Sequence, residues 1–248
     1  MSTDPTISTE QAPAKPAAAW QAVAPMWHTI LFVAIVFFFA GASAKSQAEM
    51  IARHGRMSTY LITMAWEWLL TLYVLWGASR RKVTLREITG GRWSSPEDVL
   101  LDLATALGFW LVAASVLVAL SYALGLTTAG SLDQAKKTLD PLIPRTREEV
   151  EAWVALSATA GFCEELIFRG YLQKQFRAAT GSTLIAIVLQ AVVFGCAHAY
   201  QGTRGMVLTG SYGAMFGILA AWRKSLRPGM LAHAAQDTFS GLAFRFIK

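Results

Sequence analysis

Long apolar blocks separated by short polar connections dominate the chain. Runs of about 18 or more apolar residues are typical of membrane-spanning helices, because backbone polar groups in lipid must be hydrogen-bonded within their own segment. The pattern therefore predicts an all-α fold, a polytopic transmembrane helical bundle of about seven spans. These spans are expected at approximately Met26–Ala44, Met57–Ala78, Val99–Leu126, Val150–Leu172, Thr183–Tyr200, Met206–Trp222 and Met230–Ile247. The third is long enough to be tilted or to extend beyond the membrane.

The composition agrees with a membrane protein. Hydrophobic residues make up 54% of the chain and charged residues only 15%, whereas a soluble domain carries about a quarter charged residues. Residues 1–25 are rich in Ala, Pro, Ser and Thr, so we expect a disordered amino-terminal tail. This stretch does not resemble a cleaved signal peptide, and the first span is expected to remain as an anchor. Cys163 and Cys196 both lie in apolar blocks, which disfavours a disulfide framework or a metal pair.

The positive charge is gathered in short connections beside the apolar blocks. The net charge is +6, but basic residues next to spans are typical of cytoplasmic loops and contact with anionic lipid, and we expect no nucleic-acid partner. We assign three basic connections to the cytoplasm, together with the amino terminus, namely Ser79–Asp98, Gln173–Ser182 and Arg223–Gly229. The Thr127–Glu149 loop, which this assignment places on the opposite side of the membrane, is also basic and therefore conflicts with it.

Several ionisable residues lie inside the predicted spans. A charge at the centre of a lone span costs about 2.5–3.5 kcal/mol, so it requires a partner, a water-filled cavity or a function. Glu165 and Arg169 are four residues apart and share a helix face, which favours an ion pair. Glu164 lies about 100° away around the helix and is left to face a polar cavity.

Two histidines lie in later spans. His198 ends the fifth block, and His233 and Asp237 stand four apart in the seventh. A carboxylate and an imidazole can bind and deprotonate water, and a second His with Asp can hold a carbonyl or its oxyanion. The same residue types could bind a divalent metal such as zinc, in which case Glu164, His198 and His233 are the candidate ligands. No His-Glu-x-x-His spacing supports that alternative.

Other features favour structural explanations. Glu67 in the second span either lines a cavity or pairs with a neighbour, and we favour the latter. Gly210, Gly213 and Gly217 are typical of close helix packing. Ser211 lies between glycines, but its surroundings do not match the Gly-x-Ser-x-Gly nucleophile motif.

Three motifs in order resemble the CPBP family of intramembrane peptidases, which includes type II CAAX prenyl endopeptidases and bacteriocin-immunity (Abi) relatives. They are Glu164-Glu165-x-x-x-Arg169, Phe194-x-x-x-His198 and His233-x-x-x-Asp237. The resemblance covers the carboxyl-terminal hundred residues or so. The apolar pattern predicts transmembrane helices over 26–146, and the resemblance implies a catalytic core over 147–248.

The resemblance implies an intramembrane endopeptidase whose active site lies among the carboxyl-terminal helices. Glu164 would be the general base for water, assisted by His198. His233 and Asp237 would orient the substrate or stabilise the oxyanion, while Glu165 and Arg169 would hold the site together. The chemistry would be glutamate-type or metal-dependent.

The expected partners are the lipid bilayer and a membrane-associated protein or peptide substrate, for which the resemblance offers the prenylated CAAX type as one candidate. The expected location is a bacterial plasma membrane, as a multi-pass protein. Two alternatives remain: a non-catalytic membrane binding or immunity protein of the same family, and a small transporter with a proton relay.

The predicted span boundaries conflict with a shared site. They place His198 and His233 toward opposite ends of their spans, about 10 Å from Glu164 in depth. Either the spans are shifted, or helices break near Gly170 or Gly195.

Overall fold

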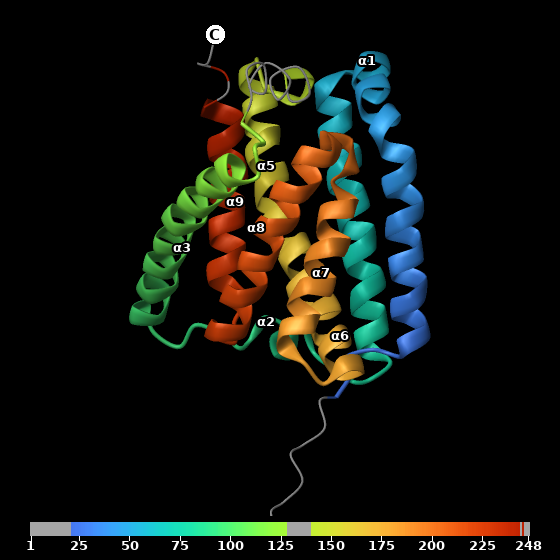
Figure 1. Ribbon diagram of the computed structural model, residues 1–248, viewed down its shortest axis with the longest axis vertical. Coiled ribbons are helices and arrows are strands. Elements are labelled where there is room, and N and C mark those ends of the chain that lie inside the picture. The colour runs from blue at the N-terminus through green and yellow to red at the C-terminus, as the bar shows by residue number, and fades with distance from the viewer. Residues whose placement is uncertain (1–20, 128–139, 244, 246–248) are drawn as a thin grey trace, which may run out of the picture.

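The computed structural model describes residues 21–127, 140–243 and 245, without the side chains of 41–48 and 50. Within these residues, all regular secondary structure is helical. The helices form a bundle with most axes roughly antiparallel (Figure 1), which confirms the predicted fold class. Most of the expected disordered tail lies outside the described residues. The last part of the predicted tail packs against the bundle, since Val23 and Ala24 are buried in its core.

Helix α1 (Met26–Ser79) contains the first two predicted spans. It folds back on itself at Gly55, whose φ of 76° and ψ of 170° are not helical. The two arms are antiparallel, because His28 near the start stacks on Tyr73 near the end, with ring centroids 3.9 Å apart. The His28 ring also contacts the Tyr171 hydroxyl at 2.6 Å. His28 therefore joins the two arms of α1 to a later helix.

The remaining helices follow in short succession. Four of them (α2, α3, α5 and α7) begin at a Ser or Thr whose side chain accepts a backbone N–H, which satisfies one free donor of the first turn. The elements are α2 (Leu85–Thr89), α3 (Pro96–Ala123), η1 (Asp140–Leu142), α5 (Arg147–Glu164), η2 (Glu165–Leu172), α6 (Gln173–Thr180), α7 (Thr183–Ala197), η3 (Ala199–Gln201), α8 (Gly202–Arg223) and α9 (Arg227–Ala243).

Three of the described helices are long and apolar enough to cross a membrane, namely Ile51–Ser79, Pro96–Ala123 and Ala199–Arg223. Met26–Ala40 and Thr183–Ala197 are shorter apolar helices. The other two predicted spans form α5 with η2, and α9, whose ionisable residues lower their hydropathy. The chain is an integral membrane protein.

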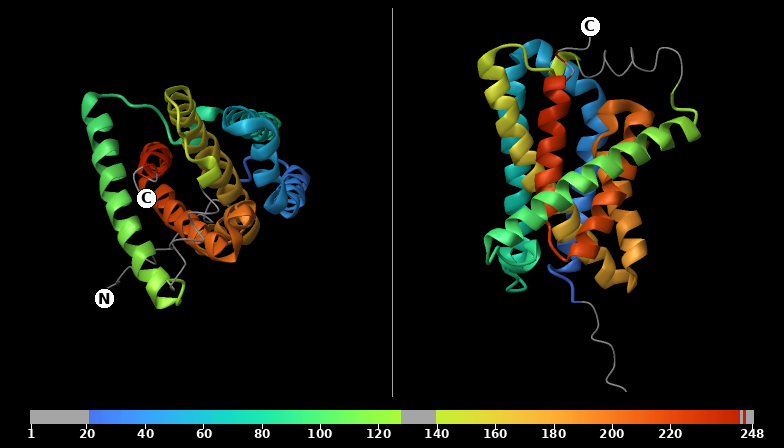
Figure 2. Two further views of the ribbon diagram at one scale, coloured as in Figure 1. Left: turned by 90° about the horizontal axis from the view of Figure 1, so that it is seen from above. Right: turned by 90° about the vertical axis from the view of Figure 1, so that its left-hand side faces the viewer.

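Helix α3 lies obliquely across the bundle and packs on α8 and α9 (Figure 2). An oblique course in the bundle is compatible with the first of the two expectations for this long span, tilt or extension beyond the membrane. Much of its surface is exposed leucine and valine, including Leu100, Leu107 and Val112. Such a surface is suited to contact with lipid.

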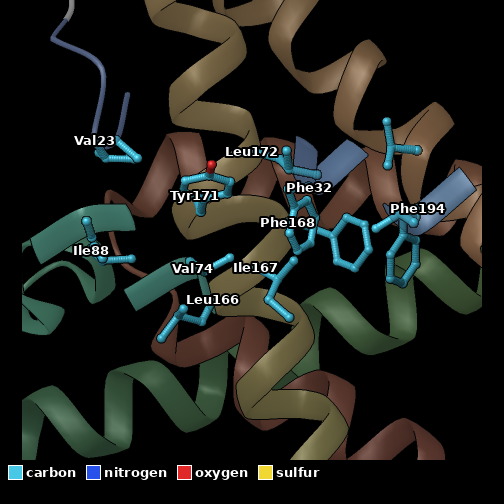
Figure 3. Close-up of a cluster of buried hydrophobic side chains, with 14 of the residues drawn as sticks. Val23, Phe32, Val74, Ile88, Leu166, Ile167, Phe168, Tyr171, Leu172 and Phe194 are labelled. Carbon is cyan, nitrogen blue, oxygen red and sulfur yellow. The ribbon is translucent and has the colours of Figure 1, made fainter. Parts of the chain in front are cut away.

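The hydrophobic core is centred on η2, a π-helical segment continuous with α5 and α6. All eight of its residues are buried. Figure 3 shows Leu166, Ile167, Phe168 and Tyr171 within this core cluster. The ring centroids of Phe168 and of Phe194 in α7 are 4.8 Å apart. Segments of π-helix are rare and occur frequently at functional sites. Here the segment begins at the paired glutamates.

Candidate active site

A buried ion pair anchors the site. The Arg169 guanidinium donates to Glu165 Oε1 at 2.9 Å, and both side chains are almost completely buried. A second guanidinium nitrogen donates to the Gly213 carbonyl of α8 at 3.1 Å. The guanidinium carbon also lies 4.4 Å from the centre of the Phe194 ring, a favourable cation–π distance. The pair predicted from the spacing is thus formed, and it ties η2 to α7 and α8.

His233 of α9 lies among three carboxylates. Its Nδ1 atom is 3.0 Å from Glu165 Oε1, and its Nε2 atom is 3.5 Å from Glu164 Oε2 and 3.6 Å from Asp237 Oδ2. Because Glu165 Oε1 already accepts from Arg169, we assign the donor role to Nδ1–H of His233. The Nε2 side of the ring is then directed at the two carboxylates that face the cavity.

The backbone sets the orientation of His198. Its Nδ1 atom lies 2.8 Å from the Phe194 carbonyl oxygen. A carbonyl can only accept, so Nδ1 carries a proton and donates, which leaves Nε2 available for a substrate or water. His198 follows the last residue of α7 directly, and helix α8 begins four residues later.

The short length of α7 explains how His198 can lie at the same depth in the bundle as Glu164, although the predicted spans separated them. Its 15 residues span about 22 Å, less than the roughly 30 Å hydrocarbon core. Figure 1 shows the α7–α8 turn stopping short of the end reached by α1 and α5. Helix α9 begins at Arg227 rather than Met230, which moves His233 deeper into its helix. The observed helix boundaries thus differ from the predicted ones. Helix α7 ends at Ala197, close to Gly195 as one alternative expected, whereas Gly170 lies inside the continuous π-helical segment η2.

Glycines bring the helices of the site into close contact. A Cβ atom on Gly161 of α5 would lie 2.8 Å from the Ala234 nitrogen and the Met230 oxygen of α9. A Cβ atom on Gly195 of α7 would lie 2.7 Å from the Met206 oxygen of α8. The α8 glycines serve packing as predicted, and the Gly213 carbonyl additionally accepts from Arg169.

Two cavities meet at the candidate residues. The larger, of about 520 Å³, is lined by Glu164, His198, His233 and Asp237. The smaller, of about 280 Å³, has a mostly apolar wall built from α1, η2 and α7. Glu164 and His198 line both cavities. Glu165 and Arg169 lie behind this wall and line neither cavity.

The structure adds two residues to the site. Glu67 lines both cavities, and its buried Oε2 atom has no hydrogen-bond partner, whereas pairing with a neighbour was the favoured expectation. Tyr212 lines the larger cavity, and its buried hydroxyl also has no partner. Glu67 was visible in the sequence as an acid inside a span, but no motif marked Tyr212. Ser211 donates to the Val207 carbonyl at 2.8 Å and lines neither cavity.

The candidate metal ligands do not form a ligand set. Among the described residues, no group of three His, Cys, Asp or Glu side chains is arranged to hold a metal ion. The Nδ1 atoms of His198 and His233 are already directed at a carbonyl and a carboxylate. Glu164, His198 and His233 therefore line a cavity together without the geometry of a metal centre.

Comparison with protein families agrees with this arrangement. Residues 146–239 match the family described as type II CAAX prenyl endopeptidase Rce1-like. Comparison with curated proteins and with solved structures gave no match. The matched segment runs from the cap of α5 to α9 and contains Glu164, His198 and His233. The match covers this carboxyl-terminal segment and supports its assignment to the CPBP family of CAAX-type proteases.

Proposed function

We propose that the protein is an intramembrane endopeptidase that hydrolyses peptide bonds with a water molecule activated by Glu164 and His198. The observation that carries the proposal is the meeting of both side chains at the wall shared by the two cavities. The family match supports the protease class. The paired motif residues Glu165 and Arg169 then act as positioning residues.

Water activation requires two acceptors on one side of the scissile bond. The Glu164 carboxylate accepts one water proton, while the Nε2 lone pair of His198 holds the other hydrogen. The water oxygen then attacks the carbonyl carbon and forms a tetrahedral oxyanion. Transfer of the proton from Glu164 to the leaving amine breaks the C–N bond and yields a carboxylic acid and an amine.

Hydrogen-bond donors on α8 and α9 would stabilise the oxyanion. The Tyr212 hydroxyl has no partner in the cavity wall, and the Nε2 side of His233 is 3.5 Å or more from its nearest carboxylates. The Tyr212 hydroxyl can donate to a substrate oxygen, and His233 can donate through Nε2–H when both of its ring nitrogens are protonated. Asp237 orients His233 from the same helix.

The smaller cavity supports the proposal of a lipid-bearing substrate. Its wall includes Val36, Phe39, Ile62 and Leu70, and it adjoins Glu164. An apolar chamber next to a polar one suits a peptide with a lipid group attached near the scissile bond, as in a prenylated CAAX tail. We therefore assign the lipid group to the smaller cavity and the peptide backbone to the larger. A bacterial plasma membrane is the location that we propose.

Cleavage of a quenched fluorescent farnesylated CAAX peptide by the purified protein tests the proposal. Glu164→Gln should reduce the rate by about a hundredfold or more, the usual contribution of a general base. Glu151→Gln is the matched control, because its side chain is 65% exposed and lies outside the site. A chelator should leave the rate unchanged.

Each result has a defined meaning. Equal cleavage by Glu164→Gln and wild type would contradict the assigned base. Loss of cleavage with chelator, restored by added metal, would contradict the metal-independent mechanism. A wild-type protein that cleaves neither farnesylated nor unmodified peptides, while binding them, would favour the non-catalytic alternative.

A further inference from the structure

A third cavity lies apart from the active site. It has a volume of about 190 Å³ and is enclosed by α2, α6 and the α8–α9 connection, with Arg169 at the end of η2 contributing to its wall. Lys174, Arg177 and Lys224 line it, and among the residues that the structure describes no carboxylate does. We call it the basic pocket. Glu164, His198 and His233 do not line it, so it is a separate site.

The cations of the basic pocket are held in place by the fold. Lys174 Nζ donates to the carbonyl oxygens of Glu87 and Ile88, both at 3.0 Å, where α2 ends. Burial lowers the pKa of Lys174, so a nearby anion would stabilise its charged form. Lys224 has a left-handed backbone conformation with φ of 52°, which turns the chain from α8 into α9.

Close packing between α2 and the α8–α9 connection forms the rest of the wall. The backbone nitrogen of Leu226 donates to the Thr89 carbonyl at 3.0 Å. Gly90 has a φ of 87°, and a Cβ atom there would clash with the Lys224 carbonyl. The pocket is thus a defined feature of the tertiary fold, because these contacts fix its opposite sides.

The basic pocket lies at the level expected for lipid headgroups. Trp222 lies two residues before Lys224 and is 70% exposed, and Trp76, at the same end of the bundle, is 48% exposed. Exposed tryptophans at span ends favour the interface between lipid and water. Figure 1 shows α2, α6 and the start of α9 at this common end, where the basic connections also lie.

We propose that the basic pocket binds the phosphate group of an anionic phospholipid. Lys174 and Lys224 supply positive charge, no carboxylate among the described residues lines the pocket, and basic pockets between membrane helices suit anionic headgroups. The exposed tryptophans favour a lipid as the source of that phosphate, since they place the pocket at the headgroup layer. Inorganic phosphate shares the chemistry and is separated from lipid by the test.

Native mass spectrometry of the purified full chain in nonionic detergent measures this binding directly. Dioleoyl phosphatidylglycerol should bind the wild type at least tenfold more tightly than dioleoyl phosphatidylcholine. Lys174→Gln combined with Lys224→Gln should remove this preference. Arg80→Gln with Arg81→Gln is the matched control, with the same loss of charge at the same end but outside the pocket. The melting temperature of each variant verifies folding.

Lys224→Glu provides a second variant, because Lys224 is exposed and its substitution removes no contact to α2. It should also lower the affinity for phosphatidylglycerol. Equal affinity for the two lipids, or equal loss in the control pair, would overturn the proposal. Complete displacement of the lipid by millimolar inorganic phosphate would support an anion site but overturn the assignment to lipid.

Discussion

Arg169 and Glu165 form an ion pair of 2.9 Å in which neither side chain reaches the surface. Removing one member of such a pair leaves an uncompensated charge in the interior, whereas removing both does not. The pair also positions the active site, because the same Glu165 oxygen contacts Nδ1 of His233. Stability and activity should therefore respond together to changes at these positions.

Substitution of Arg169 by Gln should destabilise the fold by about 3–5 kcal/mol, the typical cost of breaking a buried pair. Thermal unfolding in detergent measures the effect. The double variant Glu165→Gln with Arg169→Gln should recover part of this stability but not the cleavage rate, because His233 loses the carboxylate that its Nδ1 atom contacts. A single variant as stable as the wild type would show that the pair is not formed in the membrane.

Gly161→Ala should separate α5 from α9 and lower the cleavage rate. The added methyl group would meet the α9 backbone at 2.8 Å, and overpacking of this kind costs about 1–3 kcal/mol. Gly108→Ala on α3 is the control, since its Cβ would meet nothing within 4 Å. Cleavage kinetics and melting temperatures of the two variants give the comparison. Equal behaviour of the two would contradict the close α5–α9 contact.

One substitution at His198 separates the roles of its two ring nitrogens. His198→Asn preserves a donor near the Nδ1 position that contacts the Phe194 carbonyl, so it should fold with a melting temperature close to that of the wild type. Because no acceptor remains in place of Nε2, kcat should fall by about a hundredfold. An Asn variant with wild-type kcat would exclude a direct role for His198 in holding the water.

Ile62→Trp should narrow the smaller cavity, which Ile62 lines from a half-exposed position. We expect a higher KM for a farnesylated peptide and little change for an unmodified one. The neighbouring Leu61→Trp is the control, because Leu61 is 54% exposed and lines neither main cavity. Equal KM values for the lipidated peptide in the two variants would place the lipid elsewhere.

The sequence predicted the helical class and the Glu165–Arg169 contact because both follow from local rules. Apolar run length indicates spans, and a separation of four residues puts two side chains on one helix face. These features need no knowledge of how the helices pack.

The convergence of the site depends on tertiary features that local patterns do not contain. Hydropathy could not show that α7 stops short inside the bundle, which places His198 at the depth of Glu164. Glu67 and Tyr212 enter the cavity because α1 and α8 face it, and no spacing in the sequence indicates that orientation.

The most direct test is mass spectrometry of a farnesylated CAAX peptide incubated with the protein in liposomes. The wild type should produce two fragments in equal amounts, one with a new free carboxyl terminus, and Glu164→Gln should produce neither above background while melting at the same temperature. Equal product from the wild type and Glu164→Gln would contradict the claim that Glu164 activates the water.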